Sequence, residues 1–312
     1  MRVDDITFGT GPIGSYAADG DPTSGSETLT AALAAGLRRF DSAPSYGDGT
    51  AESLLGAALA STHASHAATV ATKVGRTRMT TPNPYARPLT PDAPRGGGGF
   101  DFTGAGVRAS LAASLRRLRR EHVDIAFLHD PELAADVVAG QAIPALVAAR
   151  EEGQIASIGA ASTSPDAMLR LAEHPEIEHV MIAAAWTLTR RDALPLLGRC
   201  ADLGVRVHAA APFDSGLLAQ HSPDPAAPYG YRAAGAADIE RARALAVICE
   251  RHGVTLPQAA LCFPLRHPAV STVVVGMRSP QEVADNVALL AGPVPDDVFE
   301  EIDHHLATED HR

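Results

Sequence analysis

Short apolar runs alternate with amphipathic stretches along most of the chain, and this alternation restricts the fold more than any other feature of the sequence. Eight apolar runs predict strands, at residues 7–9, 38–41, 68–72, 124–128, 155–159, 179–183, 205–209 and 272–275. Helical patterns fill most intervals, at residues 51–59, 107–119, 143–152, 166–173, 193–203, 237–252 and 280–290. A strand followed by a helix, repeated eight times, predicts an α/β fold of the (β/α)8 TIM-barrel type.

The chain length of 312 residues suits either one such barrel of about 250 residues with insertions or two ordinary domains. Because the alternation runs throughout, we expect one barrel domain over residues 1–312. Two segments rich in Pro, Gly and small polar residues interrupt it, at residues 77–101 and 220–235. Each follows a strand end on the carboxyl-terminal face, so we expect long mobile loops over an active site.

Composition excludes several classes of function. Hydrophobic residues make up 46% and charged residues 20%, and no apolar run or leader indicates membrane insertion or export, so we expect a cytoplasmic protein. A net charge of −11 argues against a nucleic-acid partner. Cys200, Cys249 and Cys262 lack CxxC spacing, and no HxH pair occurs. We therefore expect reduced thiols and no metal site, which argues against a metal-dependent hydrolase barrel.

A glycine pattern near the start, from Gly9 to Gly14, satisfies GxGxxG and could indicate a dinucleotide-binding fold with an open sheet. That fold requires a helix directly after the glycines. The residues after Gly14 are polar and typical of turns, and we expect the first helix to begin only after Ser26 and to end near Gly36. A glycine-rich strand end that lines a cleft, with Thr10 and Gly11 at its rim, fits the sequence better.

Four side chains able to take part in proton transfer follow the ends of three successive predicted strands: Asp41, Tyr46, Lys73 and His129. Each has an ordinary structural explanation alone, as a turn cap, a loop residue, a rim cation and a core imidazole. Parallel barrel strands all end at one face, so the four should meet there. We expect Asp41 to pair with Lys73, the lysine cation to lower the phenol pKa of Tyr46, and His129 to orient a substrate oxygen.

Three motifs contain these residues: FDSAPSYGDGTAESLLGAAL, ATKVGR and DIAFLHDPE. Through these motifs the chain resembles the aldo-keto reductase family, and the resemblance extends over essentially its whole length. The segments LHDPE, APFDSGLLA, FPLRHPAV and VVVGMRSPQEVADNVALL are similar to the branch that oxidises L-fucose or D-threo-aldoses to lactones. That branch in turn resembles pyridoxal dehydrogenases. The resemblance implies a (β/α)8 barrel and an NAD(P)-dependent oxidoreductase acting on a small sugar or aldehyde.

The resemblance also implies roles for residues. Asp41, Tyr46, Lys73 and His129 become the catalytic tetrad, with Tyr46 as the proton donor or acceptor and C4 of the nicotinamide as the hydride site. Tyr46, His129 and the aromatic Trp186 are the candidate substrate contacts. The implied cofactor contacts follow several strands: Thr10, Gly11, Asp41, Ser162, Thr163, Pro212, Phe213, Asp214, Ser215, Gly216, Leu217, Gly276, Met277, Arg278, Glu282, Asp285 and Asn286. Backbone N–H groups at 214–216 and the start of the helix near Pro280 are suited to a pyrophosphate.

Some positions depart from the usual family pattern. Where many members carry Ser-Asn to hold the nicotinamide amide, this chain has Ala160-Ala161-Ser162-Thr163. Ala183 stands near the usual glutamine and Ala210 at the usual stacking tyrosine, so Phe213 or Trp186 would have to supply an aromatic contact. A nicotinamide-binding regulatory barrel with low turnover therefore stays an alternative.

The end of the last strand bears on the choice of coenzyme. Members that prefer NADPH hold the 2′-phosphate there with Lys and Arg, whereas this chain has Met277 and Glu282, with Arg278 nearby. A carboxylate repels phosphate and accepts hydrogen bonds from ribose hydroxyls. We expect NAD to be preferred over NADP, and oxidation of an aldose lactol; pyridoxal or another aldehyde or ketone is the alternative substrate. A monomer or weak homo-oligomer is expected.

Overall fold

The computed structural model describes all residues except 19–21, 63–66, 80–97, 225–227, 230–231 and 310–312. Eight parallel strands close into a barrel in the order β1-β12-β9-β8-β7-β6-β3-β2. They are β1 (Ile6–Gly9), β2 (Arg39–Asp41), β3 (Thr69–Val74), β6 (Val123–His129), β7 (Ile155–Ser162), β8 (His179–Ala183), β9 (Arg206–Ala210) and β12 (Val270–Gly276). Each strand overlaps one of the eight predicted runs, which confirms the barrel.

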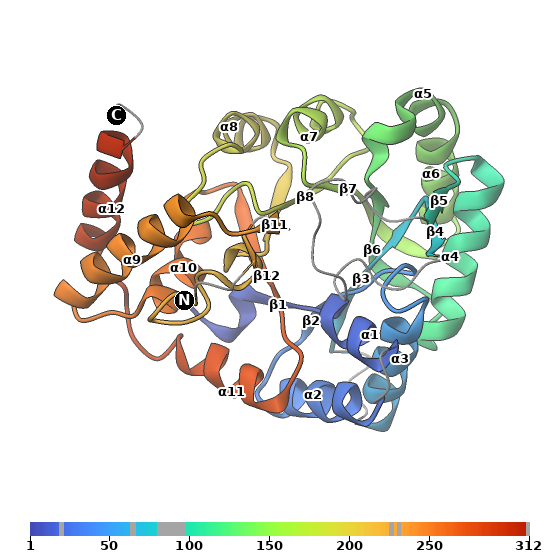
Figure 1. Ribbon diagram of the computed structural model, residues 1–312. Helices are drawn as coiled ribbons and strands as arrows, with labels where there is room; N and C mark the ends of the chain where they lie inside the picture. The colour runs from blue at the N-terminus through green and yellow to red at the C-terminus, as the bar shows by residue number, and fades with distance from the viewer. Residues whose placement is uncertain (19–21, 63–66, 80–97, 225–227, 230–231, 310–312) are drawn as a thin grey trace.

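Helices surround the strands on the outside of the barrel (Figure 1). Eight of them correspond to predicted helices: α2 (Pro22–Ala34), α3 (Thr50–Ser61), α4 (Gly104–Leu118), α6 (Ile143–Glu151), α7 (Pro165–Ala172), α8 (Leu194–Leu203), α9 (Ala236–Arg251) and α11 (Pro280–Ala288). Side-chain hydroxyls cap the first turns of α4, α7 and α11, where Thr103, Ser164 and Ser279 accept hydrogen bonds from backbone N–H groups. The sequence analysis missed α1 (Gly11–Ala18), α5 (Ala135–Val137), α10 (Leu256–Cys262) and α12 (Asp296–Glu309).

The expectation of a long polar loop after Gly14 is wrong. Helix α1 begins at Gly11, and α2 begins at Pro22 rather than after Ser26. Gly14 serves close packing: a Cβ there would lie 2.8 Å from the backbone carbonyl of Tyr46. The glycine therefore lets the helix touch the loop that carries Tyr46. The closed barrel, and not the absence of a helix, excludes the open dinucleotide-binding sheet.

The two segments expected as loops contain short antiparallel hairpins. In the first, β4 (Arg76–Met79) pairs with β5 (Gly98–Phe100); in the second, β10 (Pro228–Tyr229) pairs with β11 (Arg232–Ala233). Residues 80–97, 225–227 and 230–231 of these segments lie outside the described residues. The hairpins were not predicted because their strands are two to four residues long.

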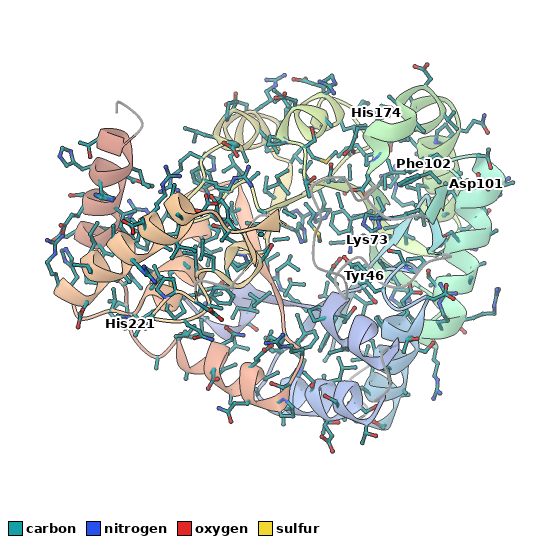
Figure 2. All side chains as sticks on the ribbon, in the orientation of Figure 1. Tyr46, Lys73, Asp101, Phe102, His174 and His221 are labelled. Carbon is teal, nitrogen blue, oxygen red and sulfur yellow. The ribbon has the colours of Figure 1, made fainter. Side chains whose placement is uncertain are left out.

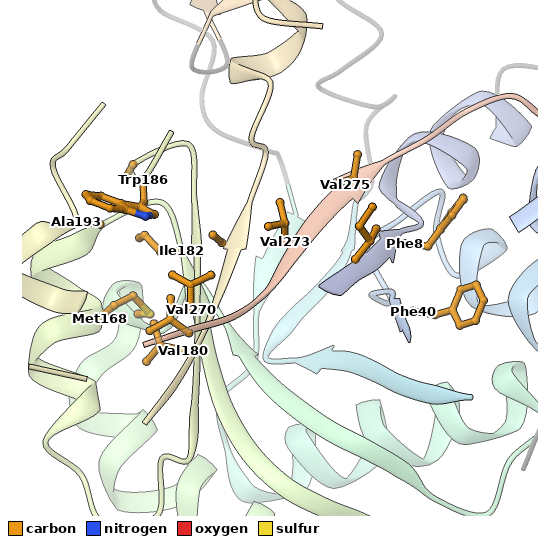
Figure 3. Packing of buried hydrophobic residues seen from close by; sticks show 14 of the residues in the cluster. Phe8, Phe40, Met168, Val180, Ile182, Trp186, Ala193, Val270, Val273 and Val275 are labelled. Carbon is orange, nitrogen blue, oxygen red and sulfur yellow. The ribbon is translucent and has the colours of Figure 1, made fainter. Parts of the chain in front are cut away.

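The core has two layers, because alternate side chains of a strand point to opposite faces. The larger layer fills the space between strands and helices, and Figure 3 shows part of it. A smaller cluster shares the other face of the strands, inside the barrel: Ala71, Ile125, Phe127, Ala161, Met181 and Val274. The inner cluster closes the barrel below the carboxyl-terminal mouth.

Two classes of feature are absent from the described part of the chain. No helix there combines the length and apolar content needed to cross a bilayer. No group of three His, Cys, Asp or Glu side chains there is placed to hold a metal ion. Cys200, Cys249 and Cys262 are free thiols.

Gly159 on β7 leaves room for the side chains of the inner cluster, so a substitution there tests the packing inside the barrel. A Cβ at this position would lie 2.5 Å from Cδ1 of Phe127, whose ring is fully buried, and 3.0 Å from the carbonyl oxygen of His179. We expect Gly159→Ala to lower the free energy of unfolding by about 1–3 kcal/mol, as measured by urea denaturation. Gly198→Ala is the matched control, because Gly198 lies on α8 with no atom within 4 Å of a Cβ. Equal stability of the two variants would contradict the packing described here.

Candidate active site

The alternation of side chains along each strand brings Lys73 and His129 into the mouth of the barrel. Lys73 follows the interior residue Ala71 by two positions on β3, and His129 follows the interior residue Phe127 by two on β6. Residues two apart on a strand share a face. Both side chains therefore lie on the inner face, just above the cluster that closes the barrel.

Lys73 and Asp41 form a buried ion pair at the base of this mouth. The Lys73 Nζ donates to Asp41 Oδ1 and Oδ2 at 2.7 and 2.6 Å, and to the carbonyl oxygen of Ser42 at 2.9 Å. Lys73 is 1% and Asp41 2% exposed. Burial raises the pKa of Asp41, and the ammonium of Lys73 opposes that effect. Three acceptors around one ammonium satisfy its three N–H donors and fix its position.

Tyr46 and His129 lie next to this pair. The Lys73 Nζ is 4.8 Å from the centre of the Tyr46 ring, and Figure 2 shows the two side chains in the middle of the ring of helices. The Tyr46 and His129 rings meet edge to face, with centres 6.2 Å apart and an angle of 88°. A Cβ on Gly11 would lie 3.7 Å from the Tyr46 ring. The four predicted tetrad residues are thus brought together.

His129 is held as a neutral imidazole. Burial lowers its pKa well below 6.5, and the cations of Lys73 and Arg76 lower it further. Its Nδ1 is buried and has no hydrogen-bond partner among the described residues. A neutral imidazole can donate to one oxygen without bringing a second charge beside Lys73.

Arg76 and Asp130 form a half-buried ion pair beside His129, with Arg76 Nη1 2.9 Å from Asp130 Oδ2. Asp130 has a left-handed backbone (φ 52°) and its N–H donates to the carbonyl oxygen of Ala161 at 2.9 Å. The Nε of Arg76 is buried and has no partner among the described atoms. Sequence reasoning missed this pair, although Arg76 lies in the motif ATKVGR and Asp130 in the motif DIAFLHDPE.

Two of the predicted cofactor residues, one directly after β1 and one at the end of β7, lie at the mouth with defined partners. Thr10 is fully buried, and its hydroxyl donates to Ser42 Oγ at 2.8 Å. Ser162, the last residue of β7, donates to Glu132 Oε1 at 2.5 Å and accepts from the Ser164 N–H at 3.0 Å. Its neighbour Thr163 is exposed. Glu132 was not among the predicted site residues.

The turn after β9 is organised around the fully buried Asp214. Its Oδ2 accepts hydrogen bonds from Thr187 Oγ1 at 2.8 Å and from Thr189 Oγ1, while its Oδ1 is buried without a described partner. The N–H groups of Asp214 and Gly216 donate to carbonyl oxygens within the turn. Two of the three N–H groups expected to bind a pyrophosphate are therefore already used inside the protein.

The other residues of this turn differ in how far they are exposed. Ser215 and Gly216 are partly exposed, whereas Pro212 and Leu217 are buried. Phe213 is partly buried and packs against the outer core, which limits the ring surface left for a nicotinamide. Ala183 and Ala210 are register partners on β8 and β9 and offer only methyl groups at the mouth.

After β12, the side chains expected at the coenzyme ribose are arranged as an internal pair. Arg278 donates from its backbone N–H to Glu282 Oε2 at 2.9 Å and from Nε to Glu282 Oε1 at 2.6 Å. Met277 is fully buried, and Gly276 is exposed. On α11, Asp285 is exposed and Asn286 is buried.

Trp186 packs in the outer core and not in the inner cluster of the barrel. Its indole N–H donates to the carbonyl oxygen of Pro264 at 3.2 Å, and its ring packs 5.0 Å from the Phe263 ring. It belongs to the layer between strands and helices, where Figure 3 shows it beside Ile182 and Ala193. These contacts account for its burial, and Trp186 is not part of the substrate site proposed below.

A parallel barrel with these side chains at the carboxyl ends of its strands defines a (β/α)8-barrel oxidoreductase that uses a nicotinamide cofactor, NAD or NADP. The family model described as "Aldo/keto reductase family" matches residues 5–307, and the chain belongs to that family.

Curated relatives match most of the chain. It is 37% identical to D-threo-aldose 1-dehydrogenase from a Pseudomonas species, over 88% of this chain and 85% of that protein. It is 30% identical to pyridoxal 4-dehydrogenase from Microbacterium luteolum, over 96% of this chain and 93% of that protein.

Solved structures support the fold. Glycerol dehydrogenase from Gluconobacter oxydans has a TM-score of 0.76 at 22% identity, covering 97% of this chain and 91% of that one. An aldo-keto reductase from Bacillus halodurans in its holo form has a TM-score of 0.74 at 23% identity, covering 96% and 91%. At this level of identity the likeness establishes the architecture alone.

Asp214 should make stability depend on pH. Burial raises its pKa from 3.8 to about 6, so the folded protein binds this proton more tightly than the unfolded chain does. Its contribution to stability is present at low pH and is lost as the pH rises from about 4 through 6. Asp214→Asn keeps an oxygen acceptor, tolerates the left-handed backbone and carries no charge.

We expect the free energy of unfolding of Asp214→Asn, relative to wild type, to rise by up to about 2 kcal/mol between pH 4 and pH 7. Urea denaturation at several pH values measures this difference. Asp166→Asn, at an exposed carboxylate on α7, is the control and should show no such trend. A difference between Asp214→Asn and wild type that is constant with pH would contradict the assignment.

Proposed function

We propose that the protein oxidises the lactol form of an aldose, of the L-fucose or D-threo-aldose type, to its lactone with NAD as the preferred coenzyme. The proposal depends on one observation: Lys73 is buried in an ion pair with Asp41, and its Nζ lies 4.8 Å from the centre of the Tyr46 ring. A cation held there stabilises a phenolate, and a phenolate can remove the proton of an alcohol. The identity to a D-threo-aldose 1-dehydrogenase supports a sugar as the alcohol.

The residues at the mouth have separate tasks in this reaction. Tyr46 accepts the proton of the anomeric hydroxyl, and Lys73 holds the negative charge that the phenol carries before this transfer. His129, neutral because of its burial, donates a hydrogen bond to the substrate oxygen and orients it. Asp41 fixes Lys73 through both carboxylate oxygens. A nicotinamide coenzyme bound at the mouth would supply the acceptor, its C4, for the hydride of C1.

The residues around the mouth fit such a coenzyme. Buried polar atoms without described partners remain on His129, Glu132 and Asp214, at the end of β6 and in the segments that follow β6 and β9 at the carboxyl-terminal face. Buried polar groups are normally hydrogen-bonded, so these atoms indicate a polar ligand at this position. Thr10, Gly11, Ser162 and the turn at 212–217 would hold it.

The preference for NAD is supported by the contacts of Arg278. Its guanidinium is paired with Glu282, and the neighbouring Met277 is buried and uncharged. A 2′-phosphate would have to compete with the Glu282 carboxylate for Arg278 and would meet its repulsion. A ribose hydroxyl can instead donate to Glu282.

Pyridoxal or a similar aldehyde is the second candidate substrate, because pyridoxal 4-dehydrogenase from Microbacterium luteolum is 30% identical over nearly the full length of both chains. The same tetrad would serve, since pyridoxal in its hemiacetal form also presents a hydroxyl and a hydrogen on one carbon. Direct comparison of the substrates separates the two.

The proposed roles predict the behaviour of Tyr46→Phe. We expect wild-type protein to form NADH, followed at 340 nm, with NAD and L-fucose, D-arabinose, L-galactose or pyridoxal. In Tyr46→Phe, kcat should fall at least about 100-fold because no group then accepts the proton. The dissociation constant for NAD, from calorimetry, should stay within about twofold. Turnover that survives in the variant would overturn the role of Tyr46; NAD binding without turnover in wild type would favour a regulatory barrel.

The contacts of Arg278 predict a change of coenzyme preference in Glu282→Gln. The variant keeps the helix cap, since the Glu282 N–H donates to Ser279 Oγ, and removes the negative charge beside Arg278. The ratio of kcat/KM for NADP to that for NAD should rise about tenfold. Glu173→Gln, which removes an equivalent exposed partner from Arg199 on the outer helices, is the control. An unchanged ratio in Glu282→Gln would show that this pair does not select the coenzyme.

A further inference from the structure

Glu132 lies at the mouth of the barrel, and the conformation of the backbone around it is closely constrained. It lies in a short 3-10 turn, Pro131–Ala134, directly after the end of β6. The turn begins at Asp130, whose left-handed backbone is held by its N–H bond to Ala161 and its ion pair with Arg76. Pro131, at the start of the turn, has its own backbone φ fixed by its ring. The side chain of Glu132 is thereby directed to the end of the neighbouring strand.

The two carboxylate oxygens of Glu132 have different surroundings. Oε1 accepts the hydroxyl hydrogen of Ser162 at 2.5 Å, and the direction of that hydroxyl is set because Ser162 Oγ already accepts the N–H of Ser164. Oε2 is buried and meets no donor among the described residues. An ionised carboxylate oxygen has only acceptor capacity, so what completes it is a donor. Ser162 thus fixes one oxygen and presents the other.

The ends of β7 and β8 supply no unused side-chain acceptor. Ala161, which precedes Ser162 on β7 and faces the barrel interior, and Ala183, at the end of β8, present only methyl groups. A primary amide that reached the ends of β7 and β8 would find Glu132 Oε2 as an acceptor that no described group occupies. Of the parts of a nicotinamide coenzyme, the carboxamide group carries such an amide, with two N–H donors.

We propose that Glu132 binds the nicotinamide carboxamide, its Oε2 accepting one N–H of the amide while Ser162 holds its Oε1. This inference rests on the proposed function only in requiring that a nicotinamide coenzyme binds at this mouth. Such a bond would hold the amide group beside Glu132 and so restrict the orientation of the nicotinamide ring. It also explains how a chain with alanines at 161 and 183 orients the ring.

A coenzyme analogue separates this role from a structural one. In 3-acetylpyridine adenine dinucleotide a methyl ketone replaces the carboxamide, so the molecule keeps its shape and lacks the N–H donors. Isothermal titration calorimetry without sugar measures the dissociation constants of NAD and the analogue for wild type, Glu132→Ala and Glu132→Gln. Glu173→Ala, which removes an exposed glutamate at the carboxyl-terminal cap of α7, is the control.

We expect Glu132→Ala to weaken NAD binding about tenfold and to leave binding of the analogue within about twofold. Glu132→Gln retains a side-chain acceptor oxygen and should lose no more than about threefold for NAD. Thermal melts of each variant confirm that it is folded. Equal weakening for NAD and the analogue, or no weakening for either, would overturn the inference.

The test also distinguishes this inference from the proposed function. Binding is measured without substrate, so failure to oxidise any sugar would count against the proposed function and leave the Glu132 result standing. Wild-type protein that binds NAD while Glu132→Ala binds it equally well would overturn the role of Glu132 alone. Wild-type protein that binds no nicotinamide coenzyme would overturn both.

Discussion

The buried ion pair between Lys73 and Asp41 is the interaction on which the mouth of the barrel depends. Each charge alone would be costly in this position, and together they satisfy each other, with the Ser42 carbonyl as third acceptor. Such a pair contributes little net stability compared with apolar packing. Its value is a fixed positive charge beneath the Tyr46 ring, which a solvated lysine at the rim would not provide.

Polar contacts around this pair determine how the mouth can meet a ligand. Glu132 is held by Ser162, Asp130 by Arg76, and Asp214 by two threonines, so each carboxylate has one oriented side. Glu132 and Asp214 each keep one buried oxygen without a described partner. The Nδ1 atom of His129 is also buried and has no described partner. A mouth of this kind is preorganised: its polar groups are in place before a coenzyme arrives.

Much of the fold could be predicted because strands and helices leave different periods in a sequence. Eight apolar runs became eight strands, and the rule that parallel strands end together predicted that Asp41, Tyr46, Lys73 and His129 would meet. The prediction was wrong after Gly14, where a helix runs through residues that are typical of turns. Gly14 is there for its contact with the Tyr46 loop, and a contact with a residue 32 positions away leaves no local pattern.

The sequence by itself determined the barrel and the tetrad, since both follow from periodicity along each strand and from the common direction of the strands. Only the tertiary structure decided the partners of the remaining side chains. It placed Trp186 in the outer core, joined Arg278 to Glu282, and brought Glu132 to Ser162. These outcomes depend on strand register, on turn geometry such as the left-handed Asp130, and on which oxygen each hydroxyl can reach. Spacing along the chain does not encode such distances, and the folded barrel sets them.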